Sequence, residues 1–310
     1  MNANVAVYSK LETVSAQLKA AARDTVFIIN DSPDLKLYQE NHFIVCDAAT
    51  FLERRAEFAA IKRQFLYVVS DFSDEENMKL IEEHKIHHLV GHNDQVFASE
   101  ILTHLNKTLM GKIWGLKSYT ENEADIKIIS LSDSKFTDEL IQDALGHFDF
   151  QEYFSSPIEY LKVMANELVS NSLYKGPNKK RLDKGLDAVD RRSPVFLKGA
   201  DLVQVTLGMD SKGVALSVQD SFGGLSYDLL ISSLKRSFQE KSVLEKKDGA
   251  GLGLYLTYLM SNQFIINFRN SVRTEVICII EKNKRYKSYK QRIRSFHFFQ
   301  EVPGEKTIDK

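Results

Sequence analysis

One segment in the second half of the chain carries three polar residues at helical spacing. Glu167, Asn171 and Lys175 lie at i, i+4 and i+8, so an α-helix places them in one polar stripe. An amide oxygen suits Mg²⁺, which takes few protein ligands, and a carboxylate can accept a proton or orient a water molecule. A lysine ammonium can face a phosphate. The alternative is an amphipathic helix whose polar side is only solvated.

A second segment, residues 217–225, combines an aspartate with glycines. An apolar strand ends at Asp220, and the chain then turns through Gly223 and Gly224. A carboxylate at a strand end can accept a hydrogen bond from an adenine amino group, and glycines let the backbone approach a flat base. An ordinary strand-to-loop turn has the same composition, so that alternative stays open.

A third segment is rich in glycine and runs into an apolar helix that continues to Met260. Its glycines are Gly249, Gly251 and Gly253, with Leu252 between the last two. The N-terminus of a helix can hold phosphates through its free N–H groups and its dipole. The segment is not a Rossmann fingerprint, because no strand directly precedes it, and no Gly-Lys-Ser/Thr follows as in a P-loop.

The elements that must position these residues fall into two patterns along the 310 residues. In the first, short apolar runs alternate with charged segments of helical length, which predicts an α/β domain with a parallel sheet. Four strands and a longer helix are expected there, over residues 25–30, 42–46, 65–70, 87–90 and 94–110.

The second pattern begins after a join at 111–123, which holds Trp114. It predicts a strand over 126–131, a helix over 137–145 and a strong helix that Ser156 and Pro157 open. Two hairpins follow, 201–208 with 213–219 and 263–269 with 274–281. We therefore expect domains at 1–118 and 119–285 and a basic, then aromatic, segment at 286–310.

The three polar and glycine-rich segments, in this order, resemble the Bergerat-type (GHKL) ATPase family over residues 122–282. Glu167 and Asn171 match its N-box, and Asp220 and Gly224 match its Asp-x-Gly-x-Gly box. The last segment matches its Gly-x-Gly-x-Gly box. The family includes histidine kinases and anti-sigma-factor serine kinases.

This resemblance implies an α/β sandwich, with a mixed sheet and helices on one face, that binds ATP and Mg²⁺. It implies that Asn171 is the Mg²⁺ ligand, that Asp220 binds adenine and that Glu167 is the catalytic base or orients water. Lys175, Gly224 and the last glycine box would complete the nucleotide site. Residues 225–248 would be the ATP lid, with basic residues in reach of phosphates: Lys235, Arg236, Lys241, Lys246 and Lys247.

Two positions depart from the family pattern. Phe222 stands where the Asp box has its first glycine, so we expect it to crowd or restack the adenine pocket. Tyr174 stands where a Lys or Arg is usual, and Lys175 comes one place later. None of the eight histidines is followed by Asp or Glu, which disfavours an orthodox histidine kinase. A strand and a helix before the N-box helix more closely resemble the anti-sigma-factor serine kinases.

The first domain resembles a two-component receiver. Asn30 and Asp31 end the first expected strand, where the family has acidic residues. Asp71 ends the third, at the phosphoacceptor position, and Gly91 ends the fourth. The family's lysine and a fifth strand are not identified, so the domain is expected to be a pseudo-receiver that works by contact, with phosphorylation of Asp71 as the alternative.

Composition excludes several classes of protein. Lys plus Arg is 41 and Asp plus Glu is 42, which excludes a generally basic nucleic-acid coat and an acidic disordered chain. Apolar runs fall short of the ~20 residues of a membrane span, and the start lacks a secretory pattern. Cys46 and Cys278 lie in expected strands, which favours buried thiols in a reducing compartment.

Two further clusters have ordinary interpretations. The basic run 282–294 contains two tyrosines, and we interpret it as a packed strand with a solvated side, with nucleic-acid contact as the alternative. Four histidines lie within nine residues but straddle a helix end and a strand, so their side chains should diverge from any common metal: His84, His87, His88 and His92.

The sequence therefore predicts a cytoplasmic signalling protein that binds ATP and Mg²⁺ and acts on a protein partner. It would be an ATP-dependent protein kinase or a regulatory switch. The alternative is a non-catalytic interaction or phosphotransfer module that retains the ATPase fold. Neither a nucleic acid nor a membrane is expected as a partner, and a homodimer stays open.

Overall fold

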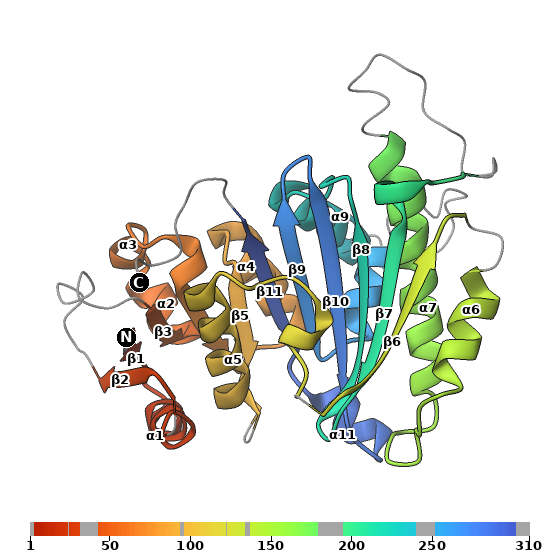
Figure 1. The fold of residues 1–310 in the computed structure, drawn as a ribbon. Coiled ribbons are helices and arrows are strands. Elements are labelled where there is room, and N and C mark those ends of the chain that lie inside the picture. The colour runs from red at the N-terminus through yellow and green to blue at the C-terminus, as the bar shows by residue number, and fades with distance from the viewer. Residues whose placement is uncertain are drawn as a thin grey trace. The chain divides into compact units, whose positions relative to one another are not determined.

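The computed structural model is an α/β protein (Figure 1) and describes residues 3–23, 25–31, 43–93, 96–121, 123–133, 137–178, 195–239 and 252–301. It divides into two compact units, and each is described by itself. The first consists of Met1–Ile113 with Arg292–Lys310, and the second is Trp114–Gln291. The expected boundary after residue 118 thus falls after Ile113, and the expected segment 286–310 is divided between the units.

The first unit contains a sheet in which five strands run parallel in the order β2-β1-β3-β4-β5. A sixth strand, β11, pairs antiparallel with β5, and His297 lies opposite His88 in this ladder. The strands are β1 (Ala3–Tyr8), β2 (Phe27–Asp31), β3 (Phe43–Asp47), β4 (Leu66–Ser70), β5 (His88–Gly91) and β11 (Ser295–Gln300).

Helices cover both faces of this sheet, as the uniform burial of β3, β4 and β5 requires. On one face α1 and α5 pack together over an apolar core that includes Val5, Leu18 and Ile101. On the other, Phe51 stacks on Phe58, and Tyr8 contacts Phe58 edge to face. The helices are α1 (Glu12–Ala21), α2 (Ala48–Glu53), α3 (Arg55–Phe58), α4 (Asp74–His84) and α5 (Phe97–Met110), with a 3₁₀ turn at Arg63–Phe65.

The first strand, β1, was not expected from the sequence, and it changes the order of all later strands. The sequence predicts that Asn30 and Asp31 end the first strand and that Asp71 ends the third. These residues do lie at strand ends, but the strand numbers are wrong, because Asn30 and Asp31 end the second strand, β2, and Asp71 follows the fourth, β4. With β1 included, the unit has five parallel strands, whereas the sequence predicts four.

The third strand along the chain is β3, and it ends at Asp47 rather than before Asp71. The side chain of Asp47 caps the N-terminus of helix α2. Its carboxylate accepts hydrogen bonds from the backbone N–H of Thr50 at 2.8 Å and of Lys10 at 2.6 Å. Burial acts to raise the pKa of Asp47, but these hydrogen bonds outweigh it and hold the pKa below its usual value. The side chain is 3% exposed, so this carboxylate is committed to starting α2.

The second unit contains a sheet in the order β9-β10-β8-β7-β6, and its described strand pairs are all antiparallel, where the sequence predicts a mixed sheet. Both expected hairpins are present. The strands are β6 (Asp125–Leu131), β7 (Val203–Met209), β8 (Gly213–Asp220), β9 (Gln263–Arg269) and β10 (Arg273–Glu281).

Helices α7 and α10 pack on this sheet and against each other, and α10 also contacts α9. The helices are α6 (Thr137–Leu145), α7 (Pro157–Ser170), α9 (Tyr227–Gln239), α10 (Leu252–Leu259) and α11 (Tyr286–Gln291), with 3₁₀ turns at Leu116–Ser118 and Gly199–Asp201. The basic run 282–294 therefore contains a short helix rather than the expected strand.

Two expectations from composition can be compared directly with the structure. Cys46 and Cys278 are both buried free thiols, as their positions in strands predict. Among the described residues, no helix combines the length and the apolar character that crossing a membrane requires.

Candidate functional site

A cavity of about 450 Å³ lies in the second unit. Its lining includes four residues that the sequence singles out: Asn171, Lys175, Asp220 and Gly224. Most of the remaining wall is apolar: Leu168, Val218, Leu225, Leu229, Leu254 and Val276. A largely apolar wall with a few converging polar groups is typical of a small-molecule site, and it suits a flat aromatic ring.

The polar stripe of the long helix is built differently from the prediction. Helix α7 begins at Pro157 and ends at Ser170, and Asn171–Lys175 then form a π-helical turn. A π turn advances fewer degrees per residue than an α turn, so the stripe bends where it reaches Asn171. Asn171 and Lys175 line the cavity as a result, whereas Glu167 is not among the lining residues.

Asp220 ends β8 and is held by its neighbours. Its Oδ1 accepts hydrogen bonds from the backbone N–H of Phe222 at 2.9 Å and of Gly223 at 3.3 Å. The Ser172 hydroxyl donates to Oδ2 at 3.4 Å. Burial raises the pKa of Asp220 to about 6, although these hydrogen bonds act to lower it. The carboxylate is therefore ionised at neutral pH and can accept a further hydrogen bond.

Gly223 makes the turn after Asp220 possible. Its φ is +59°, and its carbonyl oxygen accepts a hydrogen bond from the N–H of Ser271 at 3.1 Å. A Cβ at this position would lie 2.3 Å from the carbonyl oxygen of Arg269 and 2.5 Å from the N–H nitrogen of Val272. The glycine is therefore required both by its conformation and by the close approach of the β9–β10 turn.

We expect Gly223→Ala to be much more destabilising than Gly199→Ala. Gly199 has the same φ of +59° but nothing within 4 Å of an added Cβ, so its substitution costs only the left-handed strain of about 1–2 kcal/mol. Gly223→Ala adds an overpacking cost of about 1–3 kcal/mol. Urea unfolding of both variants measures the difference, and equal losses of stability would contradict the close approach.

Glu167 and Gly253 bring the first and third sequence segments together. A Cβ added to Gly253 would lie 1.8 Å from Oε2 of Glu167, so the carboxylate lies directly against the first turn of α10. A larger residue at this position would require the Glu167 side chain to move. The catalytic candidate Glu167 is thus positioned next to the glycine-rich segment, beside rather than within the cavity wall.

The two departures from the family pattern have defined positions. Phe222 is buried and is not among the lining residues, because its ring lies against Gly176, where an added Cβ would be 2.6 Å from the ring. Phe222 therefore contacts the cavity wall through Gly176, which lines the cavity, and its effect on the pocket stays a prediction. Tyr174 is also buried, and the neighbouring Lys175 supplies the cationic side chain that lines the cavity.

Part of the predicted site lies outside the described residues: Gly249, Gly251, Lys241, Lys246 and Lys247. Leu252 begins α10, and Lys235 and Arg236 belong to α9. The described part of the last glycine box is therefore its junction with α10.

Ser172 and Thr274 line the cavity but were not identified from the sequence. Thr274 lies opposite Asp220 in the β8–β10 ladder, and its hydroxyl is buried without a hydrogen-bond partner among the described atoms. Such a group favours a ligand that can bond to it. Ser172 could have been identified from the sequence because it is adjacent to Asn171. Thr274 could not, because its place opposite Asp220 depends on a strand pairing that the sequence does not specify.

Comparison of the chain with protein-family models found no match, and comparison with curated proteins found no relative.

Proposed function

We propose that the second unit binds ATP with Mg²⁺ as a Bergerat-type domain, and that the protein is an ATP-dependent kinase or regulatory switch. The observation that carries the proposal is the convergence of three distant segments. Asn171 and Asp220 line one cavity, and Glu167, on the helix that leads directly into the turn of Asn171, contacts Gly253 in the third segment.

The residues present fit such a ligand. The apolar wall suits the adenine ring, the ionised Asp220 can accept from its amino group, and the buried Thr274 hydroxyl lacks a partner among the described atoms. Asn171 offers an amide oxygen to Mg²⁺, which supplies charge neutralisation on the phosphates when bound. Lys175 would face a phosphate, and Glu167 would accept a proton or orient the attacking group.

Titration calorimetry of the full chain with a non-hydrolysable ATP analogue, with and without Mg²⁺, tests this proposal. We expect Mg²⁺-dependent binding in the micromolar range and weaker binding of the GTP analogue. No binding at millimolar analogue would overturn it and would leave the second candidate, an interaction module that retains the fold. If the analogue binds, transfer of labelled phosphate from ATP to a protein partner would distinguish a kinase from a regulatory switch that transfers none.

The first unit is proposed to be a receiver-like domain that acts through contacts. Its strand order 2-1-3-4-5 is one of the common doubly wound orders. The carboxylate that ends β3 is engaged as a helix cap, which supports a role other than accepting a phosphoryl group.

Adenosine affinity should depend on pH through Asp220. The pKa of about 6 means that the carboxylate gains its proton below that pH and loses an acceptor for the adenine amino group. Affinity should therefore fall as pH decreases through 6, approaching tenfold per unit. Adenosine is the probe because it carries no phosphate to titrate. A flat profile from pH 5 to 8 would remove Asp220 from the adenine contact.

A further inference from the structure

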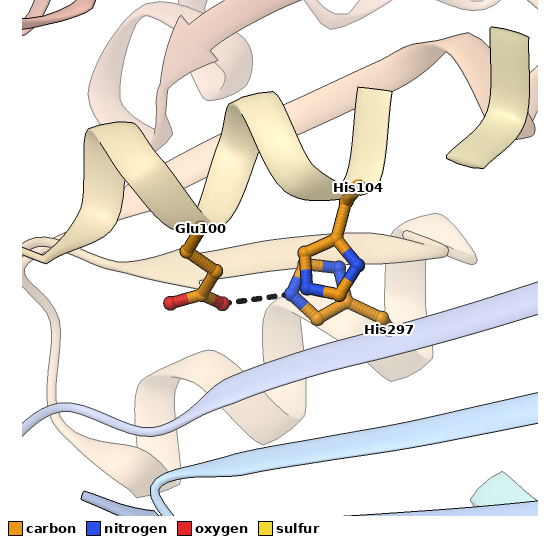
Figure 2. A group of neighbouring side chains, drawn as sticks. All are labelled: Glu100, His104 and His297. Atoms are coloured by element: carbon orange, nitrogen blue, oxygen red, sulfur yellow. Dashed lines mark hydrogen bonds and ion pairs between the residues drawn. The ribbon is translucent and has the colours of Figure 1, made fainter. Parts of the chain in front are cut away.

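A cluster of metal-ligating side chains lies in the interior of the first unit. Glu100 and His104 are four residues apart on α5, so both project from one side of this helix toward His297 on β11 (Figure 2). One ligand atom from each residue lies within 4.8 Å of the other two. The three residues are 5%, 1% and 0% exposed.

The cluster joins a carboxylate to two stacked imidazoles. Oε1 of Glu100 lies 2.8 Å from Nε2 of His297, and the rings of His104 and His297 stack with centroids 3.8 Å apart. The charge of Glu100 also interacts favourably with Arg292. A buried carboxylate requires a cation or hydrogen-bond donors around it, so the space between Glu100 and His297 must hold either a proton or a metal ion.

A fourth residue, His88, orients the ligand on β11. Its Nδ1 lies 3.3 Å from Nδ1 of His297, and both side chains are fully buried. The Nδ1–H of His297 can therefore be donated to Nδ1 of His88. That tautomer directs the Nε2 lone pair of His297 toward Glu100. Metal-bound histidines typically donate their second N–H in this way.

We propose that Glu100, His104 and His297 bind one Zn²⁺ ion. Two imidazoles and one carboxylate are a common zinc ligand set, and they disfavour Mg²⁺ and Ca²⁺, which prefer oxygen ligands. Tetrahedral bonds of about 2.0–2.1 Å separate ligand atoms by roughly 3.3 Å, so the stacked rings of His104 and His297 must turn for a nitrogen of each to point at the ion.

Zinc at this position would link two distant parts of one unit. Glu100 and His297 are 197 residues apart, and the residues of the second unit lie between them in the sequence. A bond from α5 to β11 would therefore stabilise the folded first unit, since the ion binds the folded chain and not the unfolded one.

Zinc titration of the full chain, stripped with a chelator and free of nucleotide, tests the proposal. Competition with a chromophoric chelator should give one zinc ion per chain, and Co²⁺ should give the intense visible bands of a tetrahedral site. Zinc should also raise the melting temperature. Because these measurements use the unaltered chain, an absence of stoichiometric binding would overturn the proposal whatever the nucleotide site does.

Variants locate the ion. Glu100→Gln keeps the shape and a hydrogen bond but not the charge, and His104→Ala removes one ligand, so both should weaken zinc binding by at least about 100-fold. The matched control is His147→Ala, because His147 is exposed in the second unit and pairs with Asp125. Circular dichroism verifies that each variant is folded. Zinc affinity that is unchanged in both folded cluster variants would overturn the site.

Discussion

Asn171→Ala should abolish the Mg²⁺ dependence of nucleotide binding. Asn171 lies in the π-helical turn after α7 and lines the cavity, where its amide oxygen is the proposed protein ligand of the ion. Mg²⁺ takes few protein ligands, so loss of one removes much of what fixes the ion in the site. We expect the affinity of the variant for the ATP analogue in Mg²⁺ to equal that of the unaltered protein in excess chelator.

The control for this variant is Asn166→Ala, which removes the same side chain from the same helix. Asn166 is exposed and does not line the cavity, so its substitution should leave affinity in Mg²⁺ unchanged. Calorimetry of both variants with and without Mg²⁺ provides the comparison. Retention of full Mg²⁺-dependent affinity by Asn171→Ala would eliminate the assigned role of this residue.

Local patterns in the sequence predict most of the elements that build the site. Thr137–Leu145 forms the expected helix, and both hairpins of the second half pair as predicted. These elements are specified by apolar periodicity and by turn residues close in the chain. The missed strand Ala3–Tyr8 contains Asn4 and is buried as part of a parallel sheet, where a clear alternation of apolar and polar residues is absent.

Contacts between distant segments could not be predicted from the sequence. The approach of Glu167 to Gly253 and the opposition of Thr274 to Asp220 both depend on packing and strand order. The same holds for the Glu100, His104 and His297 cluster. The spacing of its first two members is visible on the helix, whereas the third comes from a strand whose neighbour only the fold determines.

Asp220→Asn should weaken adenosine binding and at the same time stabilise the fold. This is the second large effect that we expect, and it follows from the proposed contact between Asp220 and adenine. Oδ1 accepts from the backbone N–H groups of Phe222 and Gly223, so an asparagine should keep its amide oxygen there. Its NH₂ group would then occupy the place of Oδ2 and present a donor to the adenine amino group. A lost hydrogen bond between buried groups costs about 1–3 kcal/mol, which corresponds to roughly a 10- to 100-fold loss of affinity.

The stability of the same variant should change in the opposite direction. A folded-state pKa of about 6, above the unfolded value of 3.8, means that stability falls as pH rises through this range. Two pKa units correspond to about 2–3 kcal/mol, a penalty that is fully present at pH 7.5. Asp220→Asn removes the charge, so its free energy of unfolding at pH 7.5 should exceed that of the unaltered protein.

The combination distinguishes a binding residue from a structural one. If Asp220 served only to hold the turn at Phe222 and Gly223, an asparagine that keeps these two hydrogen bonds would leave adenosine binding intact. Asp138→Asn, at an exposed position in the first turn of α6, controls for the change of charge: it should leave adenosine binding unchanged and lower stability by about 0.3–1 kcal/mol, the opposite direction to Asp220→Asn. Urea unfolding at pH 7.5 with adenosine calorimetry on the same samples decides between the two roles. An ionised carboxylate in a cavity wall lowers the free energy of unfolding, and such a destabilising group is expected where the charge binds a ligand.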